Sequence, residues 1–299
     1  MGMLVPVQTA ANARMRTSVG PVLVVTLISF TVSSLMLAVV SAVTGIPLLP
    51  SAQQINATPW WGWTGGIIAL CTITITICLV RALGQLQTTI LPLFGQLLFS
   101  LVIDHFGLFG SVRIPFSAMR MVAMLLLVVG VLLVVVIPNF KKKKEAPLTA
   151  GSHVLLWQLS AIVAGCLTAS IGAIYGRLGL SLGSAVQAST LSFFVATTVI
   201  AAVCIVSGKL GRIRMAFKKG NPWWMWVGGL CGAIAVFGNS WLIPQIGAGA
   251  FFMALLLGQM LLSLLMERYG WMESVKKQIS YVQLAGIALM TAGVAMIRI

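Results

Sequence analysis

The chain has 299 residues, of which 59% are hydrophobic and 8% are charged. Soluble globular domains are about 25% charged, and so few charges cannot cover the surface of a soluble protein of this length. The long apolar runs also exclude a disordered chain, which is polar, and a β-barrel, whose strands alternate apolar and polar residues. The composition therefore predicts an all-α membrane protein.

The apolar runs predict ten transmembrane helices, because a helix needs about 20 mainly apolar residues to cross the hydrocarbon. Cys71 to Cys78 alternates like a strand, but an open strand edge cannot face lipid, so this stretch is predicted to be helical. The first helix is too short to cross alone, which suggests either a native start upstream of Met1, the favoured explanation, or a shortened first helix. The expected helices lie at residues 1–13, 20–45, 61–82, 86–103, 116–138, 153–175, 183–206, 223–244, 249–266 and 279–297.

The two halves of the chain share an internal repeat. Pro59-Trp-Trp-Gly-Trp-Thr-Gly-Gly66 recurs 163 residues later as Pro222-Trp-Trp-Met-Trp-Val-Gly-Gly229, and the same offset carries Ser29-Phe30 onto Ser192-Phe193. This pattern indicates a tandem duplication. We expect a first five-helix unit at 1–140, a basic cytoplasmic linker at 141–152 and a second five-helix unit at 153–299. Because five is odd, the second unit enters the membrane from the opposite side, and the halves are predicted to be inverted repeats.

The net charge is +15, which in a soluble protein would suggest a nucleic-acid partner. Lys and Arg are instead retained on the cytoplasmic side of membrane proteins, so we expect no nucleic-acid partner. In the ten-helix arrangement one side holds fifteen basic residues, including the run Lys141–Lys144, and the other holds only Arg113, Arg120, Arg177 and Arg298. The first side is predicted to be cytoplasmic, with both termini outside.

The sequence predicts no metal site and no cofactor. The five Cys residues lie in apolar runs without a CxxC or Cys/His pattern, and the two His residues lie near predicted helix ends. Packing or interfacial roles are expected for all seven.

Gln96 and Gln259 are the leading candidates for substrate contact. Both fall near the centre of a predicted helix and are related by the repeat. A buried amide costs several kcal/mol unless it is hydrogen-bonded, so both should face the bundle interior, at the depth where inverted-repeat transporters bind substrate. Alternatively, each amide bonds to a neighbouring helix. The preceding Gly95 and Gly258 could line the same site, although close helix packing is the simpler explanation.

The duplicated Trp clusters open two predicted helices. Interfacial anchoring explains them, but Trp63 and Trp226 could line a vestibule that stacks on a cationic or aromatic substrate. Other polar residues in or beside the helices are candidates for substrate contact or for hydrogen bonds between helices: Gln8, Asn12, Tyr175, Gln187 and Asn239.

Asp104 and Glu267 are the acidic residues nearest to the predicted helices, and both lie at helix ends. Proton-coupled exporters use a carboxylate buried in the membrane, and no Asp or Glu lies at mid-membrane depth in the predicted helices. This pattern disfavours coupling through a carboxylate, unless Asp104 or Glu267 reaches into the cavity. Their simpler role is pairing with Arg or Lys at the interface.

With these motifs in view, the chain resembles the drug/metabolite transporter superfamily, in its YdcZ-like branch. The resemblance rests on Gln8-Thr-Ala-Ala-Asn-Ala-Arg14, the Pro-Trp-Trp-x-Trp-x-Gly-Gly signature, Gly-Gln-x-Leu-x-Ser-Leu at 95–101, and Asp104-His-Phe-Gly107 with Gly130. It implies a ten-helix bacterial inner-membrane carrier, in many members an exporter, for a small metabolite or drug. The second half departs from the pattern, because Tyr175-Gly-Arg177 replaces Asn12-Ala-Arg14 and leaves Asn12 without an assumed equivalent.

The favoured hypothesis is a secondary transporter that works by alternating access between the two half-bundles. A lipid-linked sugar flippase is the first alternative, and a wide groove lined by aromatic residues and Arg81 would favour it over a small closed polar cavity. A membrane enzyme or a scaffold is less well supported, because no nucleophile or metal constellation is present in the sequence. The expected partners are a small-molecule substrate and the lipid bilayer, and a homodimer is one possible assembly.

Overall fold

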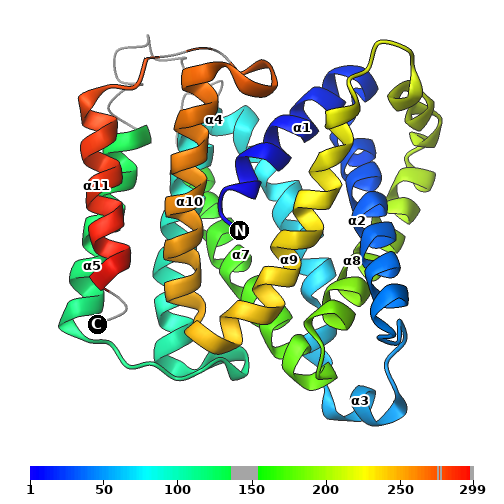
Figure 1. Ribbon diagram of the computed structural model, residues 1–299, viewed down its shortest axis with the longest axis horizontal. Coiled ribbons are helices and arrows are strands. Elements are labelled where there is room, and N and C mark those ends of the chain that lie inside the picture. Colours follow the sequence, from blue (N-terminus) through cyan, green and yellow to red (C-terminus); the bar gives the residue numbers. More distant parts are fainter. Residues whose placement is uncertain (136–153, 275, 277, 297–299) are drawn as a thin grey trace.

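The computed structural model describes residues 1–135, 154–274, 276 and 278–296, and all regular structure in these residues is helical (Figure 1). The predicted linker at 141–152 lies outside the described residues. Six of the described helices are long and apolar enough to span a membrane, at Val22–Thr44, Ala118–Val135, Val154–Leu182, Ala185–Val206, Trp223–Ile246 and Ala248–Tyr269. The prediction of an all-α fold is confirmed for the described residues, and six of their helices have the length and composition of membrane spans.

The element bounds repeat at the offset found in the sequence. Helices α2 and α8 begin 163 residues apart, as do the 3₁₀ turns η1 and η4, and α4 and α10 end at positions separated by the same number. Helices α4 and α10 each end at a glycine in the left-handed conformation, Gly107 at φ 64° and Gly270 at φ 72°. The first half holds α1 (Leu4–Val19), α2 (Val22–Thr44), α3 (Ala52–Ala57), η1 (Trp60–Trp63), α4 (Gly65–Phe106), η2 (Leu108–Gly110) and α5 (Ala118–Val135). The second half holds α7 (Val154–Leu182), α8 (Ala185–Val206), η3 (Leu210–Phe217), η4 (Trp223–Trp226), α9 (Val227–Ile246), α10 (Ala248–Tyr269), η5 (Trp271–Glu273) and α11 (Tyr281–Met296).

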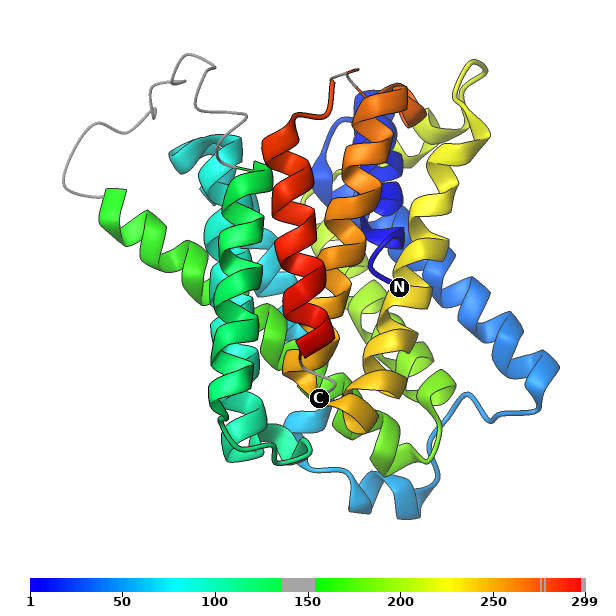
Figure 2. The ribbon, with the colours of Figure 1, turned by 60° about the vertical axis from the view of Figure 1, so that its left-hand side comes forward.

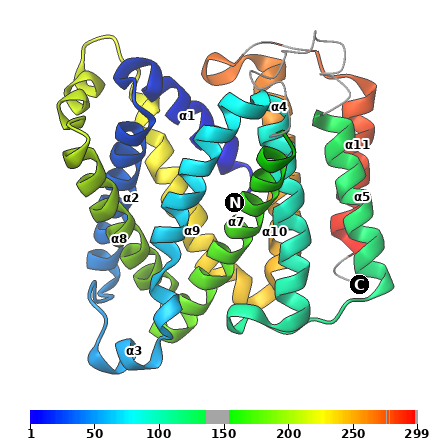
Figure 3. The same cartoon turned by 180° about the vertical axis from the view of Figure 1, so that it is seen from behind.

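Helix α4 is one continuous helix of 42 residues, where the sequence predicted two helices at 61–82 and 86–103. A straight helix of this length would span roughly 63 Å, but α4 reverses along α7. Near its start Gly65 lies against Tyr175, while Gly110, just after its end, lies against Arg177. Figure 3 shows the two arms, one rising from η1 and one descending beside α10. The element therefore runs unbroken from Gly65 to Phe106 where two helices were predicted, but its two arms lie in opposite directions, as two successive helices would.

Equivalent helices of the two halves run in opposite directions (Figure 1). In this view α2 descends and α8 ascends, whereas α5 ascends and α11 descends. Helices α5, α11 and α10 stand side by side in Figure 2. They enclose a core with the descending arm of α4, built around Leu97, Leu127, Leu256 and Met290, each at most 1% exposed.

Two predicted helix ends are displaced in the structure. Helix α7 continues past the predicted end at residue 175 to Leu182, because Gly176 and Gly179 pack directly on α9, where Gly179 faces the Ser240 carbonyl. Helix α1 is 16 residues long and extends past the predicted end at residue 13. It starts in the middle of the molecule, where Met1 lies against Gly238 of α9 (Figure 1).

Candidate functional site

A cavity of about 210 Å³ lies between the two halves of the chain. Helices α1, α2, α4, α7, α8, α9 and α10 all contribute to its wall. The described residues that line it are Gln8, Phe30, Ala69, Thr168, Ile171, Tyr175, Ser192, Phe193, Ala196, Gly232, Ala235, Val236, Asn239 and Phe252.

Residues related by the repeat line this cavity together. Three pairs with the 163-residue offset line it together: Gln8 with Ile171, Phe30 with Phe193, and Ala69 with Gly232. The rings of Phe30 and Phe193 also touch, with centroids 5.3 Å apart and planes at 83°. The cavity therefore lies where the two halves meet at equivalent positions.

Three polar side chains of the cavity wall have no hydrogen-bond partner among the described residues. They are the amides of Gln8 and Asn239 and the phenol of Tyr175, and the Oδ1 atom of Asn239 is fully buried. The hydroxyls of Thr168 and Ser192, by contrast, already donate to backbone carbonyls of their own helices, at 2.9 and 2.8 Å. The Oδ1 of Asn239 has no accessible surface, so the Gln8 amide and the Tyr175 phenol are unpaired groups of the wall that a ligand in the cavity could reach.

Asn12 and Tyr175 occupy equivalent places beside the site, although their side chains differ. Asn12 accepts a hydrogen bond of 2.7 Å from Ser29 and contacts Gly228. The equivalent of Gly228, Gly65, packs on Tyr175. Asn12 thus has a positional counterpart, and of the two only Tyr175 is among the described lining residues of the cavity.

Gln96 and Gln259 are not among the described residues that line the cavity. Gln96 is 7% exposed and lies where the descending arm of α4 crosses α7. The crossing is close, because a Cβ at Gly95 would overlap the Ile162 carbonyl and a Cβ at Gly165 would overlap the Pro92 carbonyl. This contact assigns Gly95 to helix packing.

Gln259 is partly buried on α10. The neighbouring Gly258 packs against the chain at Gly2 and Met3, so it also serves helix packing. Gln187, on α8, donates to the Leu49 carbonyl over 3.1 Å and therefore ties α8 to the segment before α3.

The Trp clusters pack against the bundle and project from it. Trp63 packs against a core formed by Leu178 and Leu182, and Trp226 stacks at a tilt on Phe217. The first Trp of each cluster is instead the exposed one, Trp60 at 80% and Trp223 at 79%. The clusters lie on opposite ends of the molecule, beside α3 and before α9 (Figure 1), as interfacial anchors would.

Asp104 is fully buried and joins three helices. Its Oδ1 accepts from the Ala248 N–H at 2.7 Å and its Oδ2 from the Gly249 N–H at 2.9 Å, so the carboxylate caps the N-terminus of α10. Arg120 of α5 lies 3.5 Å from Oδ2. The expected pairing with a basic residue is seen here, and the contacts explain Asp104 as a structural residue.

A basic residue at the end of α1 and its counterpart in α7 have different partners. Arg14 forms an ion pair of 3.2 Å with Glu273. At the equivalent position Arg177 lies against Gly110 and forms no ion pair with any described residue. Glu267 lies partly buried on α10 and, like Asp104, is absent from the lining of the described cavity.

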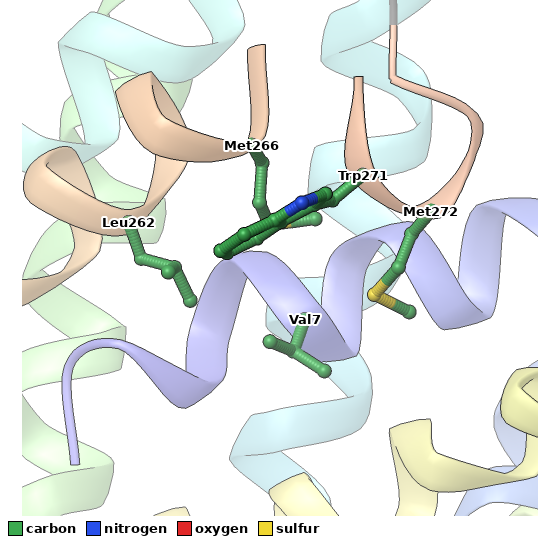
Figure 4. A pocket seen from close by; sticks show the side chains of 5 residues that line it. All are labelled: Val7, Leu262, Met266, Trp271 and Met272. Atoms are coloured by element: carbon green, nitrogen blue, oxygen red, sulfur yellow. The ribbon is translucent and has the colours of Figure 1, made fainter. Parts of the chain in front are cut away.

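A second, apolar pocket lies on the side of the bundle between α1, α10 and η5 (Figure 4). Its described lining consists of Val7, Leu262, Met266, Trp271 and Met272. These side chains offer no strong hydrogen-bonding group toward a polar ligand apart from the Trp271 indole, so this pocket is a poor candidate for the functional site.

The sequence did not single out the phenylalanines of the cavity. Phe30 and Phe193 each follow a Ser in a dipeptide that recurs at the repeat offset. This match is the feature of the sequence that could have pointed to them. Phe252 carried no such signal, because its place in the wall depends on how α10 crosses the bundle.

A family model described as "Putative inner membrane exporter, YdcZ" matches residues 1–133 and 156–296. The chain belongs to this family. The two matched segments end 163 residues apart, in agreement with the internal repeat. Membership in the YdcZ family, together with the apolar helices, identifies a multi-pass inner-membrane protein of an exporter family rather than of an enzyme family.

The fold is shared with solved structures, whereas no curated protein matches by sequence. One crystal structure of a protein aligns with a TM-score of 0.65 over 99% of this chain and 98% of its own. Its sequence identity is 13%, so the likeness concerns the fold alone. The architecture of the YdcZ-family chain is thus shared over nearly its whole length with a solved structure.

Proposed function

We propose that this protein is a secondary transporter that exports a small metabolite or drug-like molecule across the inner membrane by alternating access. The observation that carries the proposal is the cavity between the halves, lined by three pairs of repeat-related residues. In inverted-repeat transporters the substrate site lies at the repeat interface near the midplane.

The proposed architecture is ten membrane passes in two inverted five-helix units, 1–140 and 153–299, joined by a basic linker. The opposite directions of α2 and α8 and of α5 and α11 support it. So does the reversal of α4, which supplies two passes from one helix. Rocking of one unit against the other would then expose the cavity to each side in turn.

The size of the cavity favours a small molecule over a lipid-linked sugar. At about 210 Å³ it holds a compact ligand, whereas a flippase requires a wide groove. The side chain of Arg81, which would have pointed to a flippase, lies outside the described part of α4.

The residues proposed to contact substrate are first Tyr175, Asn239 and Gln8, which line the cavity. Gln96, Gln259, Asn12, Trp63 and Trp226 remain proposed contacts for other conformations of the cycle. Asp104 and Glu267 remain the proposed coupling candidates, although the contacts of Asp104 favour a structural role. We also retain the proposal that both termini are extracytoplasmic.

The test compares the compounds released by cells that express the wild-type protein with those released by cells that express a variant whose cavity is blocked. Ala235 lines the cavity, whereas its neighbour Ile234 is also partly buried on α9 but is absent from the described lining. Ala235→Trp and Ile234→Trp therefore place the same bulky side chain inside and outside the cavity. Extracellular metabolite profiles should contain compounds exported by wild type and by Ile234→Trp but lost with Ala235→Trp, at equal membrane levels. Unchanged export by Ala235→Trp would contradict the proposal.

A further inference from the structure

We propose that the segment between α8 and α9, with η3 at its centre, is a docking surface for the headgroups of anionic phospholipids. Five exposed cationic side chains form this surface, which we name the basic surface: Lys209, Arg212, Arg214, Lys218 and Lys219. The proposal does not depend on transport, because it requires only that the helices on either side of the segment span the membrane.

The ends of the neighbouring helices place the basic surface at the edge of the membrane. Helix α8 ends at Val206, and the next candidate span begins at Trp223. Lys209 is therefore three residues from one span and Lys219 is four residues from the other. A cluster of about four to eight Lys or Arg residues directly beside a membrane helix is typical of a site for anionic lipids.

Hydrogen bonds hold the segment against the bundle. Asn221 Nδ2 donates to the carbonyls of Met215 and Ala216, at 2.9 and 3.0 Å. The Oδ1 atom of the same residue accepts from Ser18 of α1 at 2.7 Å, and Ala216 is only 2% exposed, in a core shared with α1 and α2. A free loop would carry its charges into water, where salt screens them, whereas these contacts keep the cations beside the helix ends.

Two large aromatic side chains are exposed beside the cations. Phe217 is 72% exposed and Trp223 is 79% exposed, and the ring of Phe217 is tilted against Trp226 with the centroids 5.1 Å apart. Trp is enriched at the level of the headgroups, and segments that lie in the membrane interface combine Lys and Arg with Phe or Trp. The exposed side of the segment therefore matches a lipid surface in both its charge and its aromatic residues.

The fold itself does not require these charges. At the 163-residue offset the basic surface corresponds to residues 46–56, which contain no charged residue. Both segments connect equivalent helices, α2 to η1 in the first half and α8 to η4 in the second. Only the segment of the second half therefore offers a charge that is complementary to a phosphodiester.

Native mass spectrometry of the full-length protein in detergent tests the proposal. The probes are equal amounts of phosphatidylglycerol and phosphatidylcholine with the same acyl chains, so that only the headgroup differs. We expect the wild type to bind phosphatidylglycerol roughly tenfold more tightly, because each cation near an anionic group adds to the attraction. The ratio should fall toward one in about 1 M ammonium acetate, since salt screens exposed charges.

A pair of double variants locates the preference on the basic surface. Arg212→Gln with Arg214→Gln should lower the preference at least about fivefold. Arg268→Gln with Lys276→Gln removes the same charge from two exposed residues at the end of α10 and beyond η5, and should leave the preference near that of the wild type.

The alternative is that the cations only orient the chain during insertion, in which case the folded protein has no headgroup preference. Equal binding of the two lipids by the wild type, or an equal loss in both double variants, would overturn the proposal. If the Gln variant at Arg212 and Arg214 does not fold by size-exclusion chromatography, Arg212→Lys with Arg214→Lys and the salt series decide the matter. The Lys variant keeps the charge and should keep the preference, and its loss would contradict an electrostatic surface.

Discussion

Ser34 Oγ lies 3.0 Å from Thr197 Oγ1, and these two residues are each other's counterparts at the 163-residue offset. When two equivalent units meet about a two-fold axis, a residue on the axis touches its own counterpart, and contacts off the axis occur in exchanged pairs. Phe30 and Phe193 make a second contact of the first kind. The contacts of Gly65 with Tyr175 and of Gly228 with Asn12 are an exchanged pair. These relationships support the proposed inverted repeat.

The proximity of Ser34 and Thr197 can be tested by cross-linking. In a background with the five native cysteines replaced by Ala, Ser34→Cys with Thr197→Cys should form an intramolecular disulfide on mild oxidation, because the two side chains already meet. Mass spectrometry of the digested protein detects the linked peptides. Leu35→Cys with Thr197→Cys is the control, since Leu35 is 62% exposed and points about 100° around α2 from Ser34. Equal cross-linking of both pairs would contradict the proposal that Ser34 and Thr197 meet on a two-fold axis between the halves.

The orientation in the membrane is predicted by charge. The η3 segment carries Arg212 and Arg214 and lies at the end of the molecule opposite α3 (Figure 1), so it should face the cytoplasm. In the same cysteine-free background, an impermeant maleimide should label Gln53→Cys in intact cells, and Gly211→Cys only after permeabilisation. A reporter fused to Lys141–Lys144 should indicate the cytoplasm, and the reverse labelling pattern would invert the proposed topology.

Gly165 is predicted to be essential for packing. A Cβ there would overlap the Pro92 carbonyl, a backbone atom that cannot move aside cheaply. Gly165→Ala should therefore destabilise the protein by about 1–3 kcal/mol, as overpacking does, and lower the apparent Tm in detergent by several degrees. Gly211→Ala, which meets nothing within 4 Å, should leave the Tm unchanged, and a matching loss in both variants would refute the packing argument.

Asp104 is predicted to act through its cap on α10. Asp104→Ala leaves two buried N–H groups unpaired, at about 1–3 kcal/mol each, whereas Asp104→Asn keeps one acceptor. Thermal denaturation should rank the apparent Tm as wild type above Asn above Ala. If Asp104→Asn instead keeps the wild-type Tm but abolishes export, the carboxylate is a coupling group and the structural explanation is wrong.

Gln96→Leu and Gln259→Leu are each predicted to abolish export while membrane expression stays intact. Both amides lie near helix centres, and an amide held there needs a polar partner. Extracellular metabolite profiles, normalised to the protein level in the membrane, measure the effect. Wild-type export by both variants would remove the pair from the proposed site and leave the cavity residues as the contacts.

The sequence by itself determined the class of protein and its duplication. Continuous apolar runs permit only helices in lipid, because every backbone hydrogen bond must be made inside the segment. The offset of 163 residues placed matching caps, turns and helix ends in both halves, because equivalent local sequences form equivalent local structure. Tyr175 and Asn239 could also be predicted from the sequence as candidate contacts, because they are polar residues in apolar helices.

Only the tertiary structure decided which polar residues share a cavity. Gln96 and Asn239 look alike in sequence, yet Gln96 lies where α4 crosses α7 and Asn239 lines the space between the halves. Helix periodicity gives the faces of one helix but not the angle at which another crosses it, and the reversal of α4 along α7 depends on backbone contacts at Gly95 and Gly165. The chemistry of the site is therefore set by long-range packing, which no local pattern encodes.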